Sequence, residues 1–214
     1  MRTAVVVFPG SNCEQDVVRA IDTLGGEATL VWHRETDLSD FDGVILPGGF
    51  AHGDALRTGA IARFSPVMAE VTRLAETGVP VLGVCNGFQI LCEAGLVPGA
   101  LIANRDLSFI CRLVDVEVVD TDTVLTRAAT LGQILRIPLN SYEGSWVDPS
   151  QSGRVALRYV GDPNGSQERA AAVSNRTGNV VGVMPHPERA SDTMLGSVDG
   201  LVLLEGFLRS LVPA

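Results

Sequence analysis

The chain of 214 residues contains no lysine, and all 16 of its cationic side chains are arginine. Lysine is the side chain that binds phosphates in a P-loop and that forms Schiff bases with carbonyl substrates or pyridoxal phosphate. Sites of both kinds are therefore excluded. The formal net charge of −9 also argues against nucleic acid, or the surface of an anionic membrane, as a partner.

Long apolar runs and paired cysteines are missing as well. No apolar stretch approaches the ~18 residues that a membrane span needs, and no signal peptide precedes the first apolar run. The four cysteines form no CxxC pair, so a zinc site is not expected. Without a secretory signal, we expect free thiols and a cytoplasmic location.

Apolar runs alternate with helix-like patterns in the first half of the chain, and they follow one another closely after Leu113. This order predicts one α/β domain over residues 1–214, a flavodoxin-like three-layer sandwich whose central sheet is mainly parallel with antiparallel additions at one side. The predicted strands are 3–8, 28–32, 43–46, 79–84, 113–119, 124–126, 155–160, 170–174 and 180–184, and the predicted helices are 12–24, 60–76, 88–94 and 201–211.

The most informative stretch is Gly-Val-Cys-Asn-Gly at residues 83–87, between an apolar run and a helix-like pattern. It matches the elbow in which a nucleophile stands on a sharp turn from strand to helix, with Cys85 as the nucleophile. The partial positive charge of the helix N-terminus favours thiolate over thiol there. The pentapeptide alone allows a buried structural cysteine equally well.

A cysteine nucleophile needs a base, and the chain offers three histidines. His33 ends a predicted strand, where a surface or packing role is expected, and His52 lies in a glycine-rich loop with no carboxylate in fixed register. His186 stands between two prolines, with Glu188 two residues later and on the same side of an extended segment. We therefore predict His186 as the base and Glu188 as the residue that orients it. The alternative is a rigid Pro-His-Pro surface corner.

An oxyanion hole needs two backbone N–H groups near the sulfur. One is expected from Asn86, directly after the nucleophile. The other is expected from Gly49 or Phe50, because their Pro-Gly-Gly-Phe loop follows a predicted neighbouring strand and its glycines let amides turn inward. A simple tight turn is the other interpretation of this loop.

Together, the Cys85 elbow, the Gly-Gly loop before it and the Pro-His-Pro-Glu stretch after it resemble the class I glutamine amidotransferases. Further stretches are similar, more narrowly, to the glutaminase subunits of phosphoribosylformylglycinamidine synthases, and the similarity covers nearly the whole chain. These stretches are residues 8–13, 47–57, 104–112, 162–166 and 184–189.

The resemblance implies that Cys85 attacks glutamine, that a thioester forms, and that ammonia and then glutamate leave. It also implies substrate contacts from Gly48, Gln89, Ser141 and Tyr142. One segment departs from the family: Asn-Ser-Tyr stands at residues 140–142, where the subunit usually has Ala-His-Gly. The departure leaves the final ammonia acceptor open. Cys13, Cys92 and Cys111 are expected to be small buried hydrophobic residues.

The resemblance implies, for this chain, no cofactor and no metal. ATP and magnesium are expected on a large synthetase subunit, which would use the ammonia to convert formylglycinamide ribonucleotide to formylglycinamidine ribonucleotide, and a small third subunit is expected as well. Three alternatives stay open: a glutaminase that feeds a different acceptor, a Cys-His-Glu peptidase or chaperone-like hydrolase, and a non-catalytic regulatory module.

Overall fold

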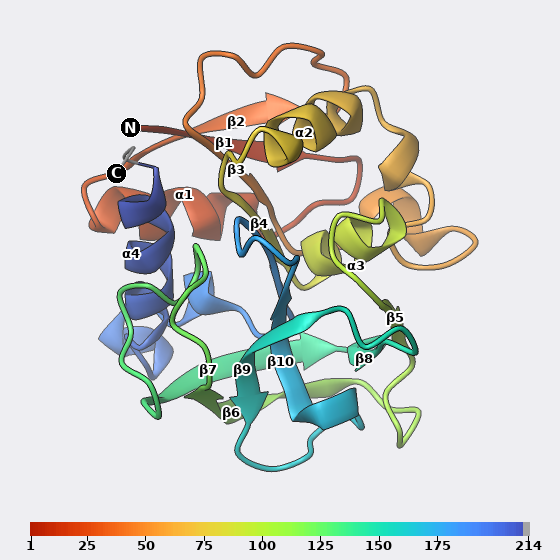
Figure 1. Ribbon diagram of the computed structural model, residues 1–214, viewed down its shortest axis with the longest axis vertical. Helices are drawn as coiled ribbons and strands as arrows, with labels where there is room; N and C mark the ends of the chain where they lie inside the picture. The colour runs from red at the N-terminus through yellow and green to blue at the C-terminus, as the bar shows by residue number, and fades with distance from the viewer. Residues whose placement is uncertain (212–214) are drawn as a thin grey trace.

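A twisted sheet forms the centre of the molecule, and the computed structural model describes residues 1–211 around it (Figure 1). Nine strands of the described chain stand in the order β2-β1-β3-β4-β11-β10-β9-β6-β7, and β5 pairs with β8 in a separate two-stranded sheet. The strands are β1 (Arg2–Val7), β2 (Glu27–Trp32), β3 (Gly43–Leu46), β4 (Val81–Val84), β5 (Ala100–Ile102), β6 (Ile110–Val118), β7 (Ile134–Ser141), β8 (Ser145–Val147), β9 (Arg154–Tyr159), β10 (Ala170–Ser174) and β11 (Val180–Val183).

The large sheet has a parallel part and an antiparallel part. Strands β2, β1, β3, β4 and β11 run parallel to one another, and the pairs from β11 to β7 are antiparallel. All residues of β3, β4 and β11 are buried, as expected for strands covered on both faces. The predicted α/β class, with antiparallel additions at one side, is confirmed.

Helices cover both faces of the parallel part (Figure 1). Helices α1 (Glu14–Thr23) and α4 (Gly200–Ser210) lie on one face, and α2 (Val67–Glu76) and α3 (Asn86–Glu93) lie on the other. Packing is close: a Cβ on Gly43 of β3 would collide with Leu211 and would lie 3.1 Å from the Phe207 ring of α4. Short 3-10 helices fill the connections at Ala51–Asp54, Ala62–Phe64, Gln167–Arg169, Pro187–Arg189 and Thr193–Leu195.

The predicted strand over 124–126 is wrong, because these residues form a turn. The hydroxyl oxygens of Thr123 and Thr126 lie 2.7 Å apart, and the Arg127 N–H donates to the Thr123 carbonyl. Val124 and Leu125 are nevertheless buried, and Gly206 of α4 packs against the Leu125 carbonyl. These residues are therefore apolar because they are buried under a helix, and not because they form a strand.

The sequence prediction also missed β5, β7 and β8. Strand β7 contains Pro138, and proline disrupts the hydrogen-bond ladder of a central strand. Here β7 is the edge of the sheet and pairs with β6 alone, so proline is tolerated. The predicted helix over 60–76 begins only at Val67, after a 3-10 turn and Pro66. In residues 1–211, the structure holds no helix that is both long and apolar enough to cross a membrane.

Candidate active site

Cys85 occupies a sharp turn between β4 and α3. Its backbone has φ 50° and ψ −103°, a conformation that costs a non-glycine residue free energy and that persists where the surroundings enforce it. The flanking glycines make the turn possible: a Cβ on Gly87 would collide with the Leu46 carbonyl, and one on Gly83 would lie 2.6 Å from Gly87. The elbow predicted from the sequence is therefore present, with Cys85 at the N-terminus of α3.

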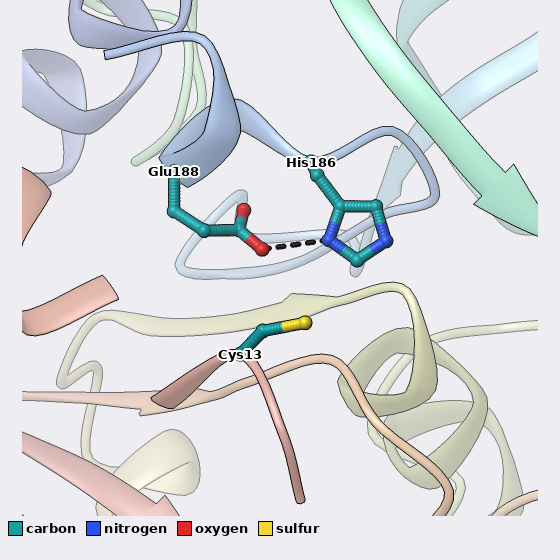
Figure 2. Close-up of side chains that lie close together, drawn as sticks. All are labelled: Cys13, His186 and Glu188. Atoms are coloured by element: carbon teal, nitrogen blue, oxygen red, sulfur yellow. Dashed lines mark hydrogen bonds and ion pairs between the residues drawn. The ribbon is translucent and has the colours of Figure 1, made fainter. Parts of the chain in front are cut away.

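His186 reaches the same edge of the sheet from the neighbouring strand. Strands β4 and β11 pair in parallel, with Val84 opposite Val183, so the residues that follow both strands lie close together. The His186 N–H donates to the Pro138 carbonyl at 2.8 Å, which anchors the segment to β7. The Nδ1 atom of His186 lies 2.6 Å from Oε1 of Glu188, and both side chains are at least 97% buried (Figure 2).

The charges around His186 favour the imidazolium. Burial by itself lowers the pKa of His186, but the negative charges on Glu188 and on the Cys85 sulfur outweigh burial and hold the pKa well above its usual value. An imidazolium next to a cysteine at a helix N-terminus stabilises the thiolate, which is the nucleophilic form. The Nε2 atom, on the side of the ring away from Glu188, has no hydrogen-bond partner among the described residues.

Cys13 is a second thiol at this site. Figure 2 shows its sulfur facing the His186–Glu188 pair, and it accepts a hydrogen bond from the Arg189 guanidinium at 3.2 Å. One ligand atom each of Cys13, His186 and Glu188 lies within 4.8 Å of the others, which raises the question of a metal. Ligands of a tetrahedral zinc ion stand about 3.3 Å apart. The 2.6 Å between His186 and Glu188 is instead the length of a hydrogen bond.

The cysteines differ from the sequence prediction in two respects. Cys13 is buried, as expected, but its sulfur has polar neighbours and borders the cavity at the site. Cys111 is exposed rather than buried, so that prediction is wrong. Cys111 lies near the start of β6, which continues beyond the part paired with β9 and is covered on one side only. Cys92 packs against the core as predicted.

A cavity of about 180 Å³ opens beside Cys85. Among the predicted residues, it is lined by Cys85, His186, Gly49, Phe50, Gln89, Ser141 and Tyr142. Residues that the sequence prediction did not assign also border it, namely Asn12, Cys13, Asp54, Thr58, Phe109, Asn140, Glu143 and Arg189. Asn140 lies in β7, and the others lie in loops or short 3-10 helices that follow no periodic pattern, so the sequence alone did not show that they face this cavity.

Gly48 packs against His186 and lies outside the lining of this cavity. A Cβ on Gly48 would lie 2.7 Å from Cε1 of His186 and 3.0 Å from the Cys13 sulfur. Glycine at this position therefore leaves room for the imidazole ring. The predicted substrate contact of Gly48 stays a prediction.

The backbone amides near Cys85 favour Gly49 over Phe50 as the second oxyanion donor. The Phe50 N–H already donates to the Gly10 carbonyl at 2.9 Å. Gly49 has φ +151°, and a Cβ there would lie 2.7 Å from the Gly10 carbonyl oxygen, so the loop packs closely on the segment before α1. Asn86 is the first residue of α3, where amides have no partner within the helix.

The side chains of Asn86 and Gln89 form a buried polar network. Asn86 accepts a hydrogen bond from the Ala51 N–H and donates to Gln89, and Gln89 donates to the Glu143 carbonyl at 2.7 Å. Gln89 is only 6% exposed, so it is not a residue of the helix surface. The network joins the glycine-rich loop, the elbow helix and the segment after β7, which are three of the walls of the cavity.

The segment that departs from the family, residues 140–142, also lines this cavity. The Cys85 thiol lies 3.5 Å from the Asn140 carbonyl oxygen. Asn104, 1% exposed, holds the segment from behind: it donates to the Ser141 carbonyl and accepts from the Gly144 N–H. Asn164 donates to the Gly144 carbonyl at 2.7 Å. The departure therefore lies in the wall of the cavity beside Cys85, on a backbone fixed by two asparagines.

The other two histidines lie away from the cavity lining. His33 is buried, with Nδ1 3.0 Å from the Ser65 hydroxyl, which confirms its packing role. The His52 ring stands edge-to-face against His33, with ring centres 5.4 Å apart. His186 is the one histidine that borders the cavity of Cys85 in the described chain.

Comparison with known proteins agrees with this geometry. Residues 1–199 match the model of the CobB/CobQ-like glutamine amidotransferase domain. The chain belongs to this glutamine amidotransferase family. Two curated members are both named phosphoribosylformylglycinamidine synthase subunit PurQ. The one from Trichormus variabilis is 50% identical over 99% of either chain, and the one from Rubrobacter xylanophilus is 52% identical over 99% of this chain and 98% of that one.

A chain in the structure of PurLQS from Thermotoga maritima is also similar. It is 44% identical to this chain, with a TM-score of 0.95, and the match covers 99% of both chains. The likeness to these relatives therefore extends along nearly the whole sequence.

Proposed function

We propose that this chain is the glutaminase subunit of a phosphoribosylformylglycinamidine synthase, which hydrolyses glutamine and passes the ammonia to a synthetase partner. The observation that carries this proposal is the Cys85 thiol on a strained elbow, bordering one cavity together with His186. The full-length likeness to PurQ subunits supports the same activity. In this role the enzyme acts in purine biosynthesis.

In the first half of the reaction, the Cys85 thiolate attacks the side-chain amide carbon of glutamine. The N–H groups of Gly49 and Asn86 stabilise the oxyanion that develops on the amide oxygen. The His186 imidazolium gives its Nε2 proton to the departing nitrogen, so ammonia leaves and a thioester remains. Glu188, hydrogen-bonded at Nδ1, fixes the tautomer and orientation of the ring.

In the second half, the now neutral His186 accepts a proton from water. The hydroxide equivalent attacks the thioester carbonyl, the C–S bond breaks, and glutamate leaves. His186 is protonated again and Cys85 returns to the thiolate. The buried Glu188 carboxylate stabilises the imidazolium in both stages, which matches its effect on the pKa of His186.

The partners follow from this division of labour. A large synthetase subunit uses ATP and magnesium to activate formylglycinamide ribonucleotide and converts it, with the ammonia, to formylglycinamidine ribonucleotide; a small third subunit completes the complex. The similarity to a chain of PurLQS supports this assembly. The four free cysteines support a reducing, cytoplasmic compartment.

Two observations weigh against the rival functions. A peptidase needs an open groove for an extended chain, whereas the cavity here is only about 180 Å³ and is lined by Asn140–Glu143 on one side. A non-catalytic module would not need Cys85 in a strained conformation. A glutaminase that feeds another acceptor is separated from the proposed subunit only by its partner.

The test is reconstitution with the large and small subunits, with glutamine-dependent formation of formylglycinamidine ribonucleotide as the readout. We expect product only when all parts are present, and slow ammonia release from the isolated chain. Cys85→Ala should abolish product formation from glutamine, whereas product formation from added ammonia should continue. Full glutaminase activity of the isolated chain would contradict coupling, and an active Cys85→Ala variant would contradict the nucleophile.

Labelling with a glutamine-analogue electrophile separates the glutaminase from the peptidase. The exposed Cys111 reacts with any general thiol reagent, so the experiment uses Cys111→Ser as its background. We expect one label, on Cys85, and protection by glutamine. Labelling that glutamine does not compete would favour the hydrolase alternative.

A further inference from the structure

The cavity at Cys85 has an acidic side that the mechanism above does not use. Asp54 and Glu143 both border it, together with Gln89 and Thr58. Asp54 comes from the glycine-rich loop and Glu143 from the segment after β7, so two distant parts of the chain bring these carboxylates together. Both residues are partly buried.

Each carboxylate is held by neutral neighbours. Glu143 accepts a hydrogen bond from the Thr58 hydroxyl at 2.8 Å, and its backbone carbonyl accepts from Gln89. The Asn86 amide nitrogen lies 3.5 Å from Oδ1 of Asp54. Asp54 itself has φ 53°, so this part of the loop keeps a costly backbone conformation while it presents the side chain.

No cation neutralises this pair among residues 1–211, where neither Asp54 nor Glu143 takes part in an ion pair. The nearest arginines in sequence, Arg57 and Arg63, are paired with Glu93 instead. Arg189 also borders the cavity, but it pairs with Asp16. Burial, and then repulsion from Glu143, raise the pKa of Asp54 to about 6. Two like charges facing one cavity without a counterion are unfavourable, unless a cation arrives with the ligand.

Other groups show that the same cavity is built for a ligand. The Nε2 atom of His186 and the hydroxyl of Ser141 are buried and have no hydrogen-bond partner within the described chain, and both residues border the cavity. Buried polar atoms are rarely left unpaired, so a molecule with polar groups is expected to fill this space. The network Asn86–Gln89–Glu143 then connects the reacting end of the cavity with its acidic side.

We propose that Asp54 and Glu143 bind the α-ammonium group of the substrate glutamine and so select a free amino acid. This inference rests on the proposed glutaminase function and specifies its substrate recognition. Glutamine places its amide carbon at Cys85, and the ammonium at the other end of the molecule neutralises the acidic pair. A peptide-bound glutamine lacks that charge and leaves two carboxylates unpaired, which disfavours its binding.

The experiment compares glutamine with glutaramate, which is glutamine without the α-amino group and is therefore smaller. The reconstituted complex is assayed for ammonia release by wild type, Asp54→Asn and Glu143→Gln. We expect wild type to prefer glutamine by about 100-fold or more in kcat/KM. Each variant should raise the KM for glutamine about 10- to 100-fold with kcat nearly unchanged, as the loss of a charge-assisted hydrogen bond predicts. The kcat/KM for glutaramate should stay unchanged.

The matched control is Asp40→Asn, which removes one negative charge from an exposed residue paired with Arg2. It should leave both substrates unaffected. If the acidic residues only support the loop, the variants will lower kcat/KM for glutamine and glutaramate alike, and the inference is wrong. Unchanged KM values for glutamine would also overturn it. If wild type releases no ammonia from glutamine in the complex, the proposed function itself fails.

Thermal unfolding gives an independent readout for the same variants. The raised pKa of Asp54 means that the folded chain binds its proton more tightly than the unfolded chain, so ionisation destabilises the fold as pH rises from about 4 to about 6. Asp54→Asn should therefore raise the melting temperature at pH 7.5 and have little effect at pH 4. A lower melting temperature of Asp54→Asn at pH 7.5 would show that the Asp54 carboxylate stabilises the fold. That result would contradict the proposal that Asp54 serves to bind a ligand.

Discussion

Single residues decide the chemistry here through the space that they leave, as well as through their functional groups. Gly48 shows this most clearly, because an added Cβ would lie 2.7 Å from the His186 ring. The imidazole would have to move away from its position beside Glu188 and Cys85. Displacements of about 1 Å in a catalytic group can lower the rate about 100-fold.

Gly48→Ala should accordingly lower kcat for glutamine hydrolysis about 100-fold and leave the fold intact. Ammonia release and a circular dichroism melt measure the two effects. The control is Gly161→Ala, since a Cβ on Gly161 meets no atom within 4 Å. Full activity of Gly48→Ala would contradict this prediction, because it would show that the His186 ring can move without a loss of kcat.

Glu188 sets the pH range in which the imidazolium exists. The raised pKa of His186 means that the charged ring is present at neutral pH and is lost as pH rises through that value; Cys85 and Cys13 are the other titratable groups that contribute to it. Glu188→Gln removes the strongest of these charges, so the pKa of His186 should fall.

We expect Glu188→Gln to shift the upper limb of the kcat/KM profile to lower pH and to reduce kcat/KM at pH 8 more than at pH 6. The pH dependence of alkylation of Cys85 by a glutamine analogue, in a Cys111→Ser background, should shift in the same direction. An upper limb that stays in place would show that Glu188 orients the ring without setting its charge.

Cys85 and His186 were easier to single out from the sequence than the other residues that border their cavity. Cys85 and His186 could be found because an elbow has fixed spacing and because histidine is scarce. Asp54, Glu143 and Arg189 could not, since nothing local shows which loop carboxylate or guanidinium faces a cavity. Cys111 was misjudged because burial was inferred from residue type, whereas its strand is covered on one side only.

Among the elements, the site depends most on pairs of neighbouring strands that end at one edge. Strands β4 and β11 were predicted because they are short, continuous apolar runs. Strand β7 was missed because of Pro138, although its end forms a wall of the cavity. The pairing partner and edge position of a strand are tertiary properties, and a local pattern does not contain them.

Asn104 holds the segment that follows β7 in place. It donates to the carbonyls of Ser108 and Ser141 and accepts from the Gly144 N–H while it is almost fully buried. Asn104→Ala should lower the free energy of unfolding by about 2–4 kcal/mol, because buried backbone groups lose their partners. It should also raise the KM for glutamine. Urea unfolding and steady-state kinetics measure the two effects.

Gln151→Ala, at an exposed loop position, is the control for this variant and should change neither quantity. If Asn104→Ala lowers stability but keeps the KM, the segment over 141–144 is held by Asn164 and Ser166 alone.

At the scale of the whole molecule, the absence of lysine has a direct consequence. Because the sequence has no lysine, the amine of Met1 is its one primary amine. This amine is exposed and lies 3.9 Å from Asp42. Arginine keeps its proton and does not react with amine-directed acylating reagents. Acylation with an N-hydroxysuccinimide ester should add at most one group by mass spectrometry and leave glutamine hydrolysis unchanged. Loss of glutaminase activity after that single modification would show that a change at Met1 affects the site of Cys85.

The pairing of β4 with β11 also determines when the cavity at Cys85 can form during synthesis of the chain. Cys85 leaves the ribosome early, but the strand that carries His186 follows only after residues 86–179 have been made. A chain that ends before β11 can therefore hold the elbow of Cys85 but cannot place His186 beside it. Only after β11 has entered the centre of the sheet, between β4 and β10, do both residues border one cavity.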